Sequence, residues 1–142
     1  ANGDAVLASQ AMGADLAYMG TRFINVEESM AEEEYKQMII DSKASDIVYT
    51  AAVSGVNANF LRPSLESMGI TEDMWSQSKK IDFGEELDAA RAEAKAWKTI
   101  WSAGQGVTSI DDTVSTTSLI DRLKAQFIEA LQRQQEVLNK YL

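Results

Sequence analysis

The stretch that decides the fold is GADLAYMGTRF, residues 13–23. Gly13 follows a short helical pattern, and the absence of a side chain suits it to the left-handed conformation that ends many helices. Residues 16–19 form a short apolar run, which is typical of a buried parallel strand. Gly20 and Thr21 then stand at the carboxyl end of that strand, where α/β barrels and doubly wound sheets bind their ligands. The stretch therefore predicts a helix stop, a buried strand and a turn rich in backbone donors.

The turn at Gly20 and Thr21 carries chemistry suited to an anion. Glycine lets backbone N–H groups approach a phosphate closely, and the Thr21 hydroxyl adds one more donor. A Gly-Thr pair after a strand is also ordinary turn chemistry, so the residue types alone leave both interpretations open.

Residues 13–23 resemble the last barrel strand of the nitronate monooxygenase family, formerly called 2-nitropropane dioxygenases. In that family the strand ends in a Gln-Met-Gly-Thr or similar tetrapeptide that holds the phosphate of FMN. Here the tetrapeptide is Tyr18, Met19, Gly20 and Thr21, so tyrosine replaces the glutamine. The resemblance implies that these four residues bind the cofactor FMN.

Two further stretches add residues to the implied cofactor site. ANG, residues 1–3, is similar to the end of a Gly-Gly-Ile-Ala-Asp-Gly run that lies near the FMN phosphate in the family, which adds Gly3. KAWKTIWSAGQGV, residues 95–107, resembles a family segment whose Ala-Gly-Gln-Gly loop returns to the barrel mouth near the flavin. That match adds Gly104 and Gln105, although a helix end without a ligand explains the same glycines.

The resemblance implies an α/β fold, namely the C-terminal part of a TIM-type (β/α)8 barrel plus a helical cap domain. The chain itself is then mostly α-helical, with one or two short strands. Residues 1–28 are expected to form the end of the barrel (seventh helix, eighth strand and phosphate turn), residues 29–115 a helical cap or insertion region, and residues 116–142 the C-terminal helix. A whole barrel needs roughly 250 residues. We therefore expect these 142 residues to be the C-terminal portion of a longer protein, without the N-terminal half of that protein.

The function implied by the resemblance is the FMN-dependent oxidation of alkyl nitronates by oxygen. In the family, a histidine on an earlier barrel strand acts on the nitroalkane, and the flavin accepts electrons that oxygen then takes up. This chain contains no histidine. We therefore predict no catalytic residue within it and no appreciable activity of the segment alone. Its expected partners are a small nitronate or nitroalkane substrate and the rest of the barrel.

Two alternatives stay open. A related FMN enzyme, of the NADH:quinone reductase or enoyl reductase type, would share the phosphate turn. A non-enzymatic helical interaction module, able to form a homodimer, would explain the helical pattern from Ser29 onward.

Composition argues against several other function classes. The chain contains no cysteine and no histidine, which removes thiolate and imidazole metal ligands and the Ser-His and Cys-His catalytic pairs. Its net charge of −9 argues against a nucleic-acid partner. No apolar run approaches the length of a membrane span, and no N-terminal segment has a signal-peptide pattern. The absence of cysteine agrees with the expected cytoplasmic location. Asp111 and Asp112 have no third carboxylate at ligand spacing, so we interpret them as a surface turn and predict no metal.

Local patterns predict the remaining elements. Asp4 is expected to cap the first helix. Ser29-x-x-Glu32 is expected to open a helix that ends near Asp41. The later expected elements, in chain order, are a strand at 46–50, a loop at 51–61, short helices at 64–68 and 71–75, a long helix from 84 to 101, and a final helix that begins within 116–118 and ends near 142.

Overall fold

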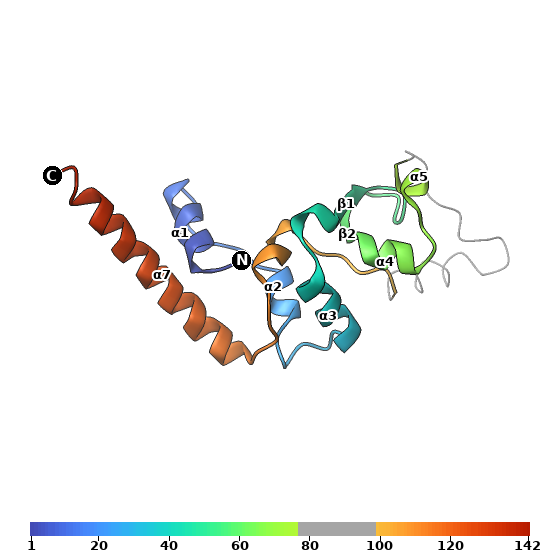
Figure 1. Ribbon diagram of the computed structural model, residues 1–142, viewed down its shortest axis with the longest axis horizontal. Coiled ribbons are helices and arrows are strands. Elements are labelled where there is room, and N and C mark those ends of the chain that lie inside the picture. Colours follow the sequence, from blue (N-terminus) through green and yellow to red (C-terminus); the bar gives the residue numbers. More distant parts are fainter. Residues whose placement is uncertain (77–98) are drawn as a thin grey trace. The chain divides into compact units, whose positions relative to one another are not determined.

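The computed structural model describes residues 1–76 and 99–142 (Figure 1). The chain divides into two compact units, the first made of residues 1–31 and 109–142 and the second of residues 32–108. Most of the helix predicted at 84–101 lies outside the described residues.

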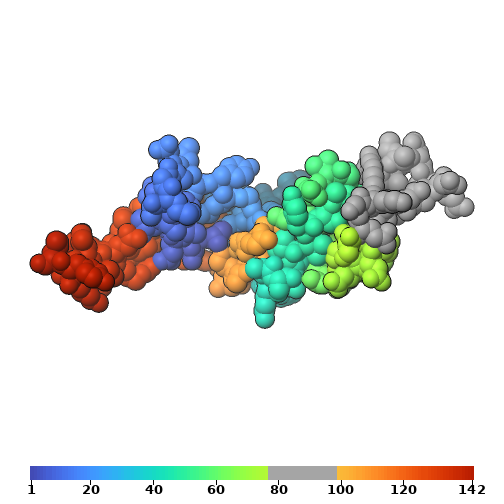
Figure 2. All heavy atoms as spheres, turned by 90° about the horizontal axis from the view of Figure 1, so that it is seen from above, coloured from blue at the N-terminus to red at the C-terminus, as the bar shows by residue number. Residues whose placement is uncertain are grey.

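The first unit is built on two helices, α1 (Gly3–Ala11) and α7 (Thr116–Leu138), which pack against each other. Figure 2 shows the blue N-terminal atoms lying against the orange and red atoms of α7. The helices approach closely at Gly3, where an added Cβ would lie 2.3 Å from the Phe127 backbone nitrogen. The Gly3 N–H also donates to Gln126 Oε1 at 3.0 Å. A residue without a side chain is therefore needed at this crossing.

Helix α1 is capped at both ends. Asn2 Oδ1 accepts a hydrogen bond from the Ala5 N–H at 2.9 Å, so the cap is Asn2 and the prediction for Asp4 is wrong. Asp4 instead forms an ion pair with Arg133 of α7. Gly13 follows the helix with a φ of +95°, which confirms the predicted left-handed stop.

The buried strand predicted at 16–19 is not present in the described structure. Leu16 and Tyr18 are 87% and 100% exposed, and these residues form no ladder with any other described segment. A strand exists only through hydrogen bonds to a neighbouring strand. The described residues offer none to this segment, so its apolar pattern stays unpaired.

The second unit contains a two-stranded antiparallel sheet. Strand β1 (Ile47–Thr50) confirms the predicted strand, and it pairs along its whole length with β2 (Ala58–Leu61). The prediction of a continuous loop at 51–61 is wrong because the chain turns back through Gly55, whose φ is +78°. Phe60 of β2 is buried in the core of this unit. The buried core residues are Val48, Val53, Phe60, Leu65, Ile70, Trp75 and Ile100.

Short helices complete the described chain. They are α2 (Thr21–Ile24), α3 (Glu33–Asp41), η1 (Ala44–Asp46), α4 (Arg62–Ser67), α5 (Glu72–Trp75) and η2 (Gln105–Ser109). Helix α3 ends where predicted, but it begins at Glu33 because the Ser29 hydroxyl accepts a hydrogen bond from the Ala31 N–H instead of capping a helix. Helices α4 and α5 lie close to their predicted positions.

Helix α7 begins one residue after its cap, Ser115, whose Oγ accepts a hydrogen bond from the Ser118 N–H. The observed start lies within the predicted range 116–118, and the helix ends at Leu138, four residues before the end expected near 142. Across the described parts of the chain, we find no helix with the length and apolarity needed to cross a membrane.

Candidate functional site

The four residues of the predicted phosphate turn, Tyr18 to Thr21, are consecutive in the first unit. Gly20 occupies the N-cap position of α2, with a φ of −92°. A Cβ added at Gly20 would meet no atom of the described residues within 4 Å, so the space at Gly20 is open within that part of the chain. Tyr18 is fully exposed beside it, while Thr21 also has an interaction within the chain. The backbone at Gly20 is therefore accessible to a ligand from outside the described residues.

The other predicted cofactor residues lie elsewhere in the chain. The space around Gly3 is filled by the α7 backbone, and its N–H is bonded to Gln126. Gly104 and Gln105 belong to the second unit, where Gln105 is exposed at the start of η2. Gly3 thus has a packing role in this structure, in contrast to the open turn at Gly20.

A buried arginine follows the turn directly in the chain. The Arg22 side chain is 2% exposed, and its guanidinium donates to the backbone carbonyl of Asp112 (3.0 Å) and to Asp112 Oδ1 (2.9 Å). Arg122 of α7 donates to Asp112 Oδ1 and Oδ2, at 3.0 and 2.7 Å. Asp112 therefore joins α2 to α7, and the prediction of a plain surface turn at this aspartate is wrong.

The arginines set the charge state of this network. The hydrogen bond from Arg122, with both guanidinium charges nearby, holds the pKa of Asp112 below its usual range against the opposing effect of burial. The same hydrogen bond raises the pKa of Arg122. The charge of Asp111 also raises the pKa of Arg122, so two aspartates interact with the two arginines. Arg22 follows Thr21 directly in the chain, so this network begins next to the predicted phosphate turn.

A second set of contacts continues along the same two segments. Val26 and Val114 form a parallel β-bridge, and the Glu27 N–H donates to the Val114 carbonyl at 3.0 Å. The Glu28 carboxylate accepts hydrogen bonds from the Thr116 N–H (2.9 and 3.0 Å) and from Thr116 Oγ1 (2.8 Å). The Thr116 backbone bond is the largest cause lowering the pKa of Glu28. Residues 22–28 are thereby held against residues 112–116.

In the second unit, an aromatic pair holds the segment before Gln105. Tyr35 stacks on Trp101 with ring centroids 5.1 Å apart, and the Tyr35 hydroxyl donates to the Ser102 carbonyl. Burial raises the pKa of Tyr35. Ser64 Oγ accepts a hydrogen bond from the Trp101 N–H at 2.8 Å. These two hydrogen bonds fix the backbone of the segment that precedes the exposed Gln105.

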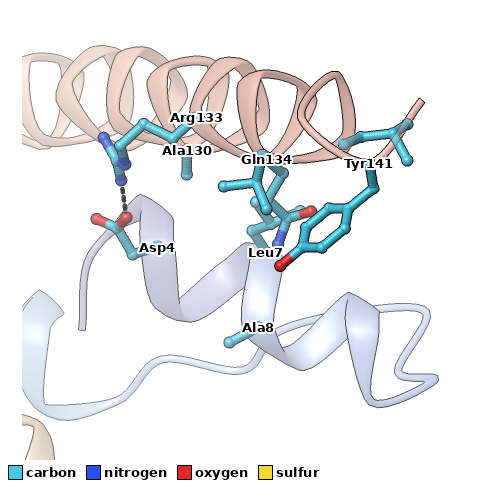
Figure 3. A pocket seen from close by; sticks show the side chains of 9 residues that line it. Asp4, Leu7, Ala8, Ala130, Arg133, Gln134 and Tyr141 are labelled. Atoms are coloured by element: carbon cyan, nitrogen blue, oxygen red, sulfur yellow. Dashed lines mark hydrogen bonds and ion pairs between the residues drawn. The ribbon is translucent and has the colours of Figure 1, made fainter.

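A groove of about 600 Å³ lies between α1 and α7, as Figure 3 shows. Its walls are mainly apolar, with the Asp4–Arg133 ion pair and Tyr141 along its edges. None of its described lining residues is a predicted cofactor residue. Within residues 1–76 and 99–142, no group of three or more acidic, histidine or cysteine residues could hold a metal ion.

Sequence reasoning missed Arg22, Asp112 and Arg122. Arg22 is separated from Asp112 by ninety positions, and a basic residue after a Gly-Thr turn gives no sign of burial. The only local hint was an aspartate pair shortly before a helix.

Two solved structures share this fold. The FabK (M276A) mutant from Thermotoga maritima matches 100% of the chain with a TM-score of 0.69 and 26% identity, and the chain covers 42% of it. Nitroalkane oxidase from Streptomyces ansochromogenes matches 93% of the chain with a TM-score of 0.63 and 26% identity, and 38% of it is covered. Both are TIM-barrel proteins. The chain therefore has the fold of part of an α/β barrel protein.

The sequence also identifies the family. Residues 2–126 match the family described as nitronate monooxygenase, and the chain belongs to this family. A protein of Staphylococcus haemolyticus (strain JCSC1435) named probable nitronate monooxygenase is 30% identical over 129 residues, which make up 88% of this chain. The chain spans only 36% of the length of that relative. The family predicted from residues 13–23 is thus confirmed.

Proposed function

We propose that this chain is part of an FMN-dependent oxidoreductase that oxidises alkyl nitronates, and that the Gly20–Thr21 turn holds the phosphate of FMN. The observation that carries the proposal is the open backbone at Gly20, where a Cβ would meet no described atom within 4 Å. Membership of the nitronate monooxygenase family supports the reaction class.

The donor set at the turn fits a phosphate. Backbone N–H groups and a threonine hydroxyl are donors of the kind that bind phosphate. Gly3 does not fit the same role because its N–H donates to Gln126, so we leave it out of the phosphate contacts. FMN, when bound, supplies the electron transfer, while this chain's residues bind and orient it.

Gln105 belongs to the second unit and remains a separate proposed contact for the cofactor or the substrate. Its side-chain amide offers both a donor and an acceptor, and the Tyr35–Trp101 pair fixes the backbone just before it. The base that acts on the nitroalkane would come from the rest of the longer protein. We therefore expect these 142 residues alone to bind flavin without turning over nitronate.

A second candidate is an FMN reductase of the quinone or enoyl type. The FabK structure favours this candidate, because it matches the chain with a TM-score of 0.69, compared with 0.63 for nitroalkane oxidase. Oxygen consumption by the longer protein with an alkyl nitronate separates the candidates. Nitronate-dependent oxygen uptake supports the first, and NADH oxidation without such uptake supports the second.

The phosphate turn is tested by comparing FMN with riboflavin, which differs from FMN only in lacking the phosphate. We expect the chain to bind FMN at least about tenfold more tightly, equivalent to about 1.4 kcal/mol, as measured by quenching of flavin fluorescence. Gly20→Ala should weaken FMN binding and leave riboflavin binding unchanged, since the new Cβ meets no protein atom but enters the space proposed for the phosphate. Equal affinities for the two flavins in the unaltered chain would overturn the proposal.

A further inference from the structure

We propose that Arg22 is a positioning residue that sets the phosphate-binding conformation of the Gly20–Thr21 turn through its ion pair with Asp112. The inference rests on the proposed function and adds a residue to that site. Arg22 would act through the backbone, because its guanidinium is engaged with Asp112.

Helix α2 cannot hold the turn by itself. It has four residues, and no side chain caps its start. A single helical turn fixes several backbone dihedrals for very few hydrogen bonds, so such a short helix is unstable in isolation. Its conformation, and with it the direction of the first backbone N–H groups, must come from contacts with other segments.

Arg22 directly follows the turn, and its contact with Asp112 anchors this part of the chain to another segment. Its two donors bind different groups of the same residue, the carbonyl and the carboxylate of Asp112, at 3.0 and 2.9 Å. A planar guanidinium that makes two bonds fixes both position and orientation. The Asp112 carboxylate is in turn fixed by Arg122 through both of its oxygens. The anchor is therefore tied to helix α7 and does not depend on a mobile side chain.

If Arg22 acted only through its charge, two substitutions would give different results from those expected if it positions the turn. Arg22→Lys keeps the positive charge but cannot make the two planar bonds, so positioning is lost while the charge is retained. Asp112→Asn removes a negative charge, which by simple attraction would strengthen binding of the FMN phosphate. If Asp112 instead orients Arg22, the same substitution weakens phosphate binding.

The experiment measures dissociation constants for FMN and riboflavin with the unaltered chain, Arg22→Lys and Asp112→Asn. We expect both variants to lose the preference for FMN, a fall of about tenfold in the riboflavin-to-FMN ratio of dissociation constants, with little change for riboflavin. Val26→Ala is the matched control, because Val26 is buried in the same pair of segments but carries no charge. It should lower stability and keep the preference.

Each outcome is decisive. A preference for FMN that survives in Arg22→Lys and Asp112→Asn overturns the inference while the phosphate turn stands. Equal loss of the preference in Val26→Ala also overturns it, since it would mean that any loss of packing has the same effect. No preference in the unaltered chain overturns the proposed function itself. If Arg22→Lys does not fold, as judged by circular dichroism, Asp112→Asn alone decides between weaker and stronger FMN binding.

Discussion

Replacing Gly3 by alanine tests the closest contact in the first unit. The added Cβ would lie 2.3 Å from the Phe127 backbone nitrogen, 2.5 Å from Gln126 Cβ and 2.6 Å from the Gln126 carbonyl carbon. Two of these atoms are backbone of α7, so α1 must move away from the helix to admit the methyl group. Overpacking of this kind typically costs about 1–3 kcal/mol, and the better helix propensity of alanine returns at most about 1 kcal/mol.

We therefore expect Gly3→Ala to lower the free energy of unfolding by about 1–2 kcal/mol, measured by urea denaturation followed by circular dichroism. Gly20→Ala is the matched control, because a Cβ there meets no atom within 4 Å and the backbone φ of −92° suits alanine. Its effect should stay within about 0.5 kcal/mol. A Gly3→Ala chain as stable as the control would show that α1 and α7 do not cross at this residue.

Three further substitutions or conditions follow from single contacts. Ser115→Ala removes the cap of α7 and should cost about 1 kcal/mol in urea denaturation, whereas no loss would mean that Glu28 alone satisfies the helix start. Tyr35→Phe keeps the ring stack on Trp101 but removes the donor to a carbonyl, and should also cost about 1 kcal/mol. The pKa of Asp112 is lower in the folded chain than in the unfolded chain, where it is about 4. Its contribution to stability is therefore complete above the unfolded-state pKa and is lost as the pH falls through the folded-state pKa. Acid titration of stability should therefore be shallower in Asp112→Asn, and identical curves would contradict the ion-pair network.

Local signals were sufficient for elements that form through contacts within a few residues. The glycine stop after α1 and the first strand of the hairpin were both predicted at their observed places. The second strand was missed because its pairing depends on a turn at Gly55 rather than on its own apolar pattern. The opposite error occurred at residues 16–19, where a strand-like pattern finds no partner among the described residues.

The turn of the candidate site could be predicted from the sequence, but the contacts that hold it to other segments could not. Gly20 and Thr21 are recognisable from a short motif, because both lie in one stretch of chain. The adjoining network joins Arg22 to Asp112, ninety positions away, and Asp112 to Arg122 of α7. No local pattern encodes a contact across ninety positions. The same limit applies to Glu28, which reaches the start of α7 from eighty-eight positions away.

The most direct test of the phosphate turn is an amide chemical-shift titration of the isotope-labelled chain. Spectra are recorded with FMN, with riboflavin and with inorganic phosphate. The proposed site predicts that the backbone amide signals of Gly20 and Thr21 shift with FMN and with phosphate and stay in place with riboflavin. Saturating FMN that leaves both signals unmoved, or that shifts them no more than riboflavin does, would contradict the assignment of this turn as the phosphate site.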